Sequence, residues 1–89
     1  MTIFEDAQKL HNDNQATFNI PNDECLSKVK SGDSVKVAIC GERFWVEVTN
    51  RDGDNLIGYV DNDLLCTDLH GLAYKDIVNF EVKHIHDVL

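Results

Sequence analysis

The sequence predicts an α+β fold, with two short helices in the first third of the chain and five short antiparallel strands in the rest. Apolar residues recur at helical spacing before Gly32, whereas after it they alternate with polar residues in short runs. Residues that favour tight turns, such as Gly41 and Asp52-Gly53, separate these runs. The change of period divides a helical segment, residues 1–31, from a β core, residues 32–89.

The length of the chain fits a single domain, residues 1–89. A chain of 89 residues can form a core, but it buries only about 60 to 65% of the surface that it exposes when unfolded. A large internal active-site cavity is therefore not expected. The two short helices would not be stable alone, so we expect them to cover an apolar face of the sheet.

The first helix is predicted at about residues 3–11. It opens with a capping box from Thr2 to Glu5, and apolar residues follow at helical spacing. A polar run then ends the helix. Residues 17–20 are expected to be extended, because the last of them precedes Pro21 and is pushed out of the α region.

A second short helix is predicted to begin after Asn22, whose side chain can cap it. Gly32 supplies a left-handed stop beyond its end. The apolar face of this helix is expected to hold Cys25, Leu26 and Val29.

The next two runs predict a hairpin with one buried face. Gly41-Glu42 is a plausible two-residue loop between them. Alternation places Trp45 and Glu47 on the opposite face. The residues expected to face the core are Val35, Val37 and Ile39 in the first strand, and Phe44, Val46 and Val48 in the second.

Three further strands complete the predicted sheet. The third follows the turn at Asp52-Gly53, with Gly58 in mid-strand marking a bulge or a sharp bend. The fourth is expected at residues 64–67 and the fifth at residues 77–81. Five short, strongly bent strands most economically form a small SH3-like barrel. The third strand contains Leu56, Gly58 and Val60, and the inward residues of the fifth are expected to be Val78, Phe80 and Val82.

Several of these motifs resemble those of the small bacterial proteins grouped as family 2314 of the domains of unknown function. The resemblance covers about residues 18–89, and Trp45-Val46-Glu47-Val48 is its most specific part. The family closes with a Gly-Asp-x-Val-x-Phe strand, where this chain has Lys75 in the glycine position. The resemblance implies a compact, mostly β fold and brings no catalytic residues. The shared residues are Phe18-x-Ile20-Pro21, Gly32-Asp33-x-Val35-Lys36-Val37, Gly41-Glu42-Arg43-x-Trp45-Val46-Glu47-Val48-Thr49, Gly53-Asp54 and Gly58.

Charge and cysteine content narrow the function classes. A formal net charge of -8 disfavours nucleic acid and anionic membranes as partners. The N-terminus lacks a signal-like pattern, so we expect a cytoplasmic protein. We also expect the protein to be a monomer or a weak dimer. The cysteines Cys25, Cys40 and Cys66 have no CxxC spacing, which predicts free buried thiols rather than a disulfide framework or a zinc ribbon. No cofactor is expected.

A metal site or a small hydrolase is the alternative. Cys66, His70, His84 and His86 are ligand types that could close a tetrahedral zinc site, although strand alternation would turn the last two to opposite sides. Cys40 or Cys66 could also pair with a histidine as a nucleophile. The competing structural interpretation places His70 in a turn and the last two histidines in a terminal helical turn docked through Ile85, Val88 and Leu89.

Acidic residues gather in one short segment. They lack the glutamate spacing of an EF-hand, so we interpret them as solvated turn aspartates, or as carboxylates at one end of the barrel that would steer a basic partner. These residues are Asp52, Asp54, Asp61, Asp63 and Asp68.

Trp45 is the most informative candidate for a binding residue. Alternation places it beside Glu47 and near Tyr59, on the face opposite the core. The structural explanation, which we favour, is that the first helix with Phe4 and Leu10 folds over it. The functional explanation is an exposed aromatic platform of the kind used in peptide recognition.

These observations favour a small acidic binding module that is not an enzyme and that engages a protein partner as a regulator or an inhibitor. The binding candidates are Trp45, Tyr59, Glu47 and the four turn aspartates Asp52, Asp54, Asp61 and Asp63. The alternative is a metal-dependent or Cys/His hydrolase that uses Cys66 and the C-terminal histidines.

Overall fold

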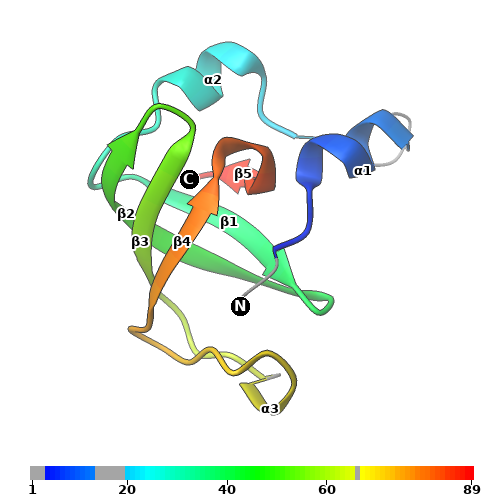
Figure 1. Ribbon diagram of the computed structural model, residues 1–89, viewed down its shortest axis with the longest axis vertical. Helices are drawn as coiled ribbons and strands as arrows, with labels where there is room; N and C mark the ends of the chain where they lie inside the picture. The colour runs from blue at the N-terminus through cyan, green and yellow to red at the C-terminus, as the bar shows by residue number, and fades with distance from the viewer. Residues whose placement is uncertain (1–3, 14–19, 66) are drawn as a thin grey trace.

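The computed structural model describes residues 4–13, 20–65 and 67–89, and it places five antiparallel strands in one sheet (Figure 1). The strand order is β4-β3-β2-β1-β5, so β4 and β5 form the two edges and the sheet is not closed. The strands are β1 (Ser34–Ile39), β2 (Glu42–Asp52), β3 (Asn55–Val60), β4 (Ile77–Glu81) and β5 (Asp87–Val88).

The fourth strand predicted at residues 64–67 is wrong. The chain instead enters a single helical turn, α3 (Thr67–His70), in which the Gly71 N–H donates to the Thr67 carbonyl at 2.8 Å. Gly71 has a φ of 78° and ends the turn. The predicted fifth strand is therefore β4, and the fifth strand of the sheet is β5, which follows the 3₁₀ helix η1 (Val82–His84).

Both hairpins have two-residue loops. The first loop is Cys40-Gly41, one residue earlier than predicted, and Ile39 pairs with Glu42. The two loop residues have φ values of 51° and 79°, the signature of a type I′ turn. The second loop is Gly53-Asp54.

The irregularity predicted at Gly58 lies on the opposing strand. The register of β2 against β3 shifts between Val48 and Asn50, and Val48 is the partner of Gly58. Gly58 is needed for close approach, because a methyl group there would clash with the Glu47 carbonyl and lie 2.6 Å from a γ-methyl of Val46. The extra residue that this shift inserts in β2 turns the Arg51 side chain toward the core face of the sheet.

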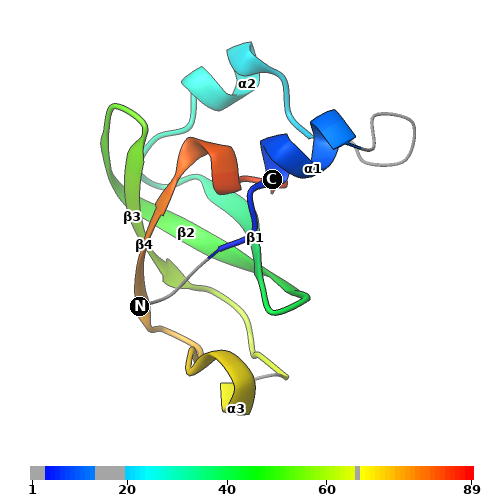
Figure 2. The same ribbon diagram turned by 45° about the vertical axis from the view of Figure 1, so that its right-hand side comes forward.

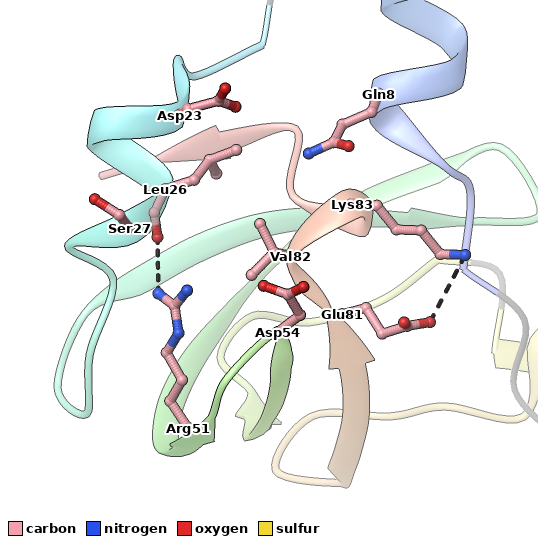
Figure 3. A pocket seen from close by; sticks show the side chains of 9 residues that line it. All are labelled: Gln8, Asp23, Leu26, Ser27, Arg51, Asp54, Glu81, Val82 and Lys83. Carbon is pink, nitrogen blue, oxygen red and sulfur yellow. Dashed lines mark hydrogen bonds and ion pairs between the residues drawn. The ribbon is translucent and has the colours of Figure 1, made fainter.

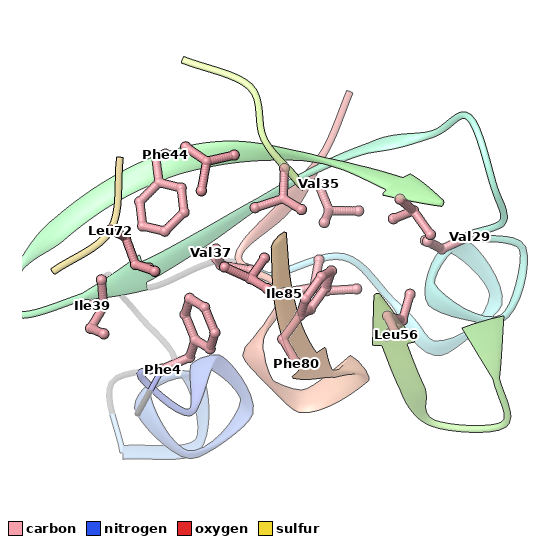
Figure 4. Close-up of a cluster of buried hydrophobic side chains, with 14 of the residues drawn as sticks. Phe4, Val29, Val35, Val37, Ile39, Phe44, Leu56, Leu72, Phe80 and Ile85 are labelled. Carbon is pink, nitrogen blue, oxygen red and sulfur yellow. The ribbon is translucent and has the colours of Figure 1, made fainter. Parts of the chain in front are cut away.

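The apolar core lies on the predicted face of the sheet (Figure 4). Phe4 joins it from the N-terminal segment, with its ring centroid 6.3 Å from that of Phe44 and 6.2 Å from that of Phe80. Ala38 is also buried, although alternation assigned it to the other face. The predicted inward residues that are buried are Val35, Val37, Ile39, Phe44, Val46, Val48, Val78 and Phe80. Val82 is only partly buried, because it lies in η1 and not in a strand. Leu56, Gly58 and Val60 of β3 are also buried.

The first helix, α1 (Ala7–Asp13), begins later than predicted. Phe4 is not yet helical, and the Asp6 carboxylate accepts a hydrogen bond from the Lys9 N–H at 2.9 Å, as an N-cap residue does. The predicted capping residue Thr2, like most of the extended stretch 17–20, lies outside the described residues.

The second helix, α2 (Asp23–Ser27), is capped by Asn22 as predicted, through a 2.8 Å hydrogen bond from the Cys25 N–H. Leu26 and Val29 are buried, but Cys25 is exposed. Successive residues of a helix point in different directions, and with Leu26 turned toward the core, Cys25 faces solvent. Cys40 is exposed in its hairpin loop. The prediction of buried thiols is therefore wrong for both cysteines, while Cys66 lies outside the described residues.

Figure 2 shows α1 and α2 at one end of the sheet and α3 at the other.

Candidate functional site

The face of the sheet opposite the core carries both predicted aromatic candidates. On this outer face Trp45 lies opposite Lys36, Glu47 lies opposite Tyr59, and Tyr59 lies opposite a residue of β4. Two exposed isoleucines extend the apolar surface. The outer face consists of Lys36, Trp45, Glu47, Ile57, Tyr59, Ile77 and Asn79.

The N-terminal segment does not place Phe4 over Trp45, so the favoured structural explanation is wrong. Phe4 is buried in the core against Phe44, on the other side of β2. Trp45 itself is half-buried, and the ammonium of Lys36 lies 4.8 Å from the centre of its ring. Its backbone N–H donates to the Asn62 side-chain oxygen at 2.6 Å. The strand is thus fixed while one side of the indole faces the outer surface.

The Tyr59 hydroxyl donates a hydrogen bond to the Glu47 carboxylate. This bond to an anionic acceptor, together with burial and nearby negative charge, raises the pKa of Tyr59 above its ordinary value of 10.0. The Lys75 ammonium lies 4.9 Å from the Tyr59 ring centre and 4.9 Å from that of Tyr74. Lys75 has a φ of 76°, in a turn position that favours glycine. Both outer aromatic residues named by the sequence therefore hold a cation at the ring.

The predicted turn aspartates do not gather at one end of the sheet. Asp52 and Asp54 flank the β2–β3 loop, whereas Asp61 and Asp63 follow the other end of β3. Six residues of strand separate the two pairs, a distance of about 20 Å. Only the second pair lies near the outer aromatic residues, since the Asp61 N–H donates to the Trp45 carbonyl at 2.9 Å.

Sequence reasoning placed Glu42 only in the first hairpin loop, whereas the structure places it at the start of β2, where its side chain organises the loop before β4. One carboxylate oxygen lies 2.9 Å from His70 Nε2, and the other accepts from the Leu65 N–H at 2.7 Å. His70 Nδ1 accepts from the Leu72 N–H at 3.0 Å, so the ring is the Nε2–H tautomer. The His70 side chain is fully buried and that of Glu42 is 11% exposed. Both ring nitrogens of His70 are therefore engaged within the chain.

The candidate metal ligands do not form a cluster among the described residues. No group of three His, Cys, Asp or Glu side chains in residues 4–13, 20–65 and 67–89 is placed to hold a metal ion. His84 Nδ1 accepts from the Glu81 N–H at 2.9 Å as part of a capping box. Cys66 lies outside the described residues. Of the predicted docking residues at the C-terminus, Ile85 is buried, Val88 is partly buried and Leu89 is exposed.

His84 and His86 have pKa values below the ordinary value of 6.5. Burial is the main cause in both cases, because it penalises the charged imidazolium. The neighbouring Arg43 lowers the pKa of His86 further, while Glu5 raises it. For His84, the main opposing influence is Glu81.

Acidification is expected to destabilise the protein through these two histidines. Since each folded pKa lies below the unfolded value, the unfolded chain binds more protons between the two, and stability falls as pH decreases below about 6.5. Urea unfolding at a series of pH values measures this slope. The double variant His84→Gln, His86→Gln should flatten it, and an unchanged slope in the variant would contradict the assignment.

A cleft, separate from the outer face, lies where α1, α2, η1 and the β2–β3 hairpin meet (Figure 3). Its volume is about 420 Å³. Its two cations already have partners: Arg51 Nη1 donates to the Leu26 and Val29 carbonyls at 2.7 and 2.9 Å, and Lys83 lies 3.8 Å from Glu81. The cleft is therefore a weaker candidate for anion binding than its composition suggests.

Comparisons with family models, curated proteins and solved structures find no match to the chain. No helix among the described residues is both long enough and apolar enough to cross a membrane.

Proposed function

We propose that this protein is a binding module that is not an enzyme and that engages a protein partner through the outer face around Trp45 and Tyr59. The observation that carries the proposal is that two aromatic side chains lie on a sheet face away from the core, beside isoleucines that are 40% and 66% exposed, Ile57 and Ile77. Aromatic side chains of this kind dominate the energetics of protein interfaces.

The chemistry of the outer face favours a basic partner. Lys36 over Trp45 and Lys75 over Tyr59 show that both rings can accept a cation at their faces. An arginine or lysine of a partner could replace these exposed contacts and gain the neighbouring Glu47 carboxylate. The chain's net charge of -8 would steer such a partner toward it.

The fold supports the same proposal. The sheet order with a 3₁₀ helix between β4 and β5 fits an SH3-like barrel, which is the finer description that we propose. Such domains bind peptides in grooves lined by aromatic side chains. Membership of the uncharacterised bacterial family that the sequence resembles, and a location in the cytoplasm, are parts of the same proposal.

The hydrolase alternative finds less support in the geometry. Its histidine closest to Cys66 in sequence, His70, uses one ring nitrogen toward Glu42 and the other toward a backbone N–H. A catalytic base needs a nitrogen that can reach its substrate or nucleophile.

A displayed library of random peptides, selected on the wild-type protein, tests the proposed site. We expect the enriched sequences to combine arginine or lysine with an apolar residue. Fluorescence anisotropy of dye-labelled synthetic peptides measures binding to the wild type and to each variant, because this signal does not depend on Trp45, the one tryptophan of the chain. Trp45→Ala should weaken binding at least about tenfold. Asp52→Asn, at the C-terminal end of β2 and far from Trp45, should change it little. Selected peptides that bind the Trp45→Ala variant as well as the wild type would place the site elsewhere.

A further inference from the structure

Among the residues that the structure describes, the edge strand β4 has part of its backbone without a hydrogen-bond partner. β4 pairs with β3 on one side only, in an antiparallel register in which Leu56 faces Phe80 and Gly58 faces Val78. Its edge is apolar at one position, since Ile77 is 66% exposed. An open edge of this kind is a template for pairing with another strand.

The hydrogen bonds at both ends of the β3–β4 ladder show which groups point outward. The Val60 N–H donates to the Asp76 carbonyl at 2.9 Å, and the Val82 N–H donates to the Asp54 carbonyl at 2.9 Å. Hydrogen-bonded pairs alternate along an antiparallel ladder, so Val78 and Phe80 bond to β3. The N–H and C=O groups of Ile77 and Asn79 therefore face the open edge, and among the described residues no further backbone hydrogen bond engages them.

The residues that flank this stretch close it at both ends. The Lys75 N–H donates to the Val60 carbonyl at 2.8 Å, and the Glu81 N–H donates to His84 Nδ1 at 2.9 Å. Within the described part of the chain, Ile77 and Asn79 have N–H groups without a partner, and the flanking Lys75 and Glu81 have N–H groups that are used. Together they define a short docking edge.

We propose that this edge pairs with the same edge of a second copy of the chain, antiparallel and centred on Val78. Ile77 of each copy then lies opposite Asn79 of the other, and all four outward N–H groups find a carbonyl. A shift of one register step would place Lys75 or Glu81 opposite an edge residue, and the N–H groups of both are already engaged. The centred register is therefore the one that satisfies every free group.

Side-chain charge favours the same register. Counting outward from the centre brings the end of β4 that carries Glu81 of each copy close to Lys75 of the other, which lies in the turn before β4. This gives two opposite-charge pairs related by the two-fold axis. The surrounding net charge of -8 on each copy opposes association, so the dimer should strengthen as salt rises.

Sedimentation of the wild-type protein from about 1 to about 500 µM tests the pairing, because a weak dimer forms by mass action. We expect the average mass to rise from one chain toward two. Asn79→Pro removes an outward N–H while leaving the β3–β4 ladder intact, as proline is tolerated on an edge strand. It should raise the Kd at least about tenfold. Asn79→Ala, which keeps the N–H, is the matched control and should still dimerise.

Amide hydrogen exchange of the wild-type protein tests the same edge without a substitution. The Ile77 and Asn79 amides should gain protection as concentration rises, while those of Val78 and Phe80 stay protected throughout. A single-chain mass at all concentrations, a dimer that survives Asn79→Pro, or exchange at Ile77 and Asn79 that ignores concentration would each overturn the proposal.

Discussion

Phe44→Ala is expected to destabilise the protein by about 3 to 5 kcal/mol, the range for truncating a buried aromatic residue. The Phe44 side chain is 1% exposed, and its ring lies against that of Phe4 and 6.4 Å from the ring of the buried His70. Removing the ring leaves a cavity between β2, the N-terminal segment that carries Phe4 and the turn that carries His70. Urea unfolding followed by circular dichroism measures the loss.

The neighbouring residue on the same strand provides the control. Trp45→Ala removes a larger side chain, but from the outer face, where the residue is half-buried and the Lys36 ammonium lies 4.8 Å from the ring centre. We expect a loss of about 1 kcal/mol. Equal losses at Phe44 and Trp45 would mean that both faces of the sheet are covered.

Glu42→Ala is expected to cost about 2 to 3 kcal/mol, because it leaves the buried His70 Nε2–H without its charged acceptor. The carboxylate holds His70 Nε2 at 2.9 Å and the Leu65 N–H at 2.7 Å. The loop between β3 and β4 should loosen along with the loss of stability. Differential amide exchange of residues 61–76 measures that local effect.

An exposed glutamate gives the matched comparison. Glu24 forms a 3.2 Å ion pair with Lys28 in which both side chains are more than 70% exposed, at 78% and 73%. Glu24→Ala should therefore change stability by no more than about 0.5 kcal/mol. Similar small losses for both variants would contradict the structural role assigned to Glu42.

The sheet could be predicted from the sequence wherever alternation was regular. The residues predicted to face the core in β1 and β2 follow a period of two, and burial confirms each of them. The same rule failed for residues 64–67, where two adjacent leucines suggested a strand. There the chain makes a helical turn whose partner, Glu42, is distant in sequence and could not be inferred from local pattern.

The candidate site was predicted in part. Alternation placed Trp45, Glu47 and Tyr59 on one face, and the strand register brings them together. Whether that face is covered depends on where the N-terminal segment docks, and this is set by tertiary contacts that a local sequence pattern does not reveal. Phe4 packs on the face of Phe44, where it meets other aromatic rings. The turn aspartates were close in sequence, but a strand between them separates them in space.

The central claim is that the outer face around Trp45 is open to a partner, and acrylamide quenching of tryptophan fluorescence tests it most directly. The account predicts an emission shifted toward that of a hydrated indole, with a quenching constant that is a substantial fraction of the value in urea. An emission typical of a buried indole, with quenching that appears only on unfolding, would contradict it.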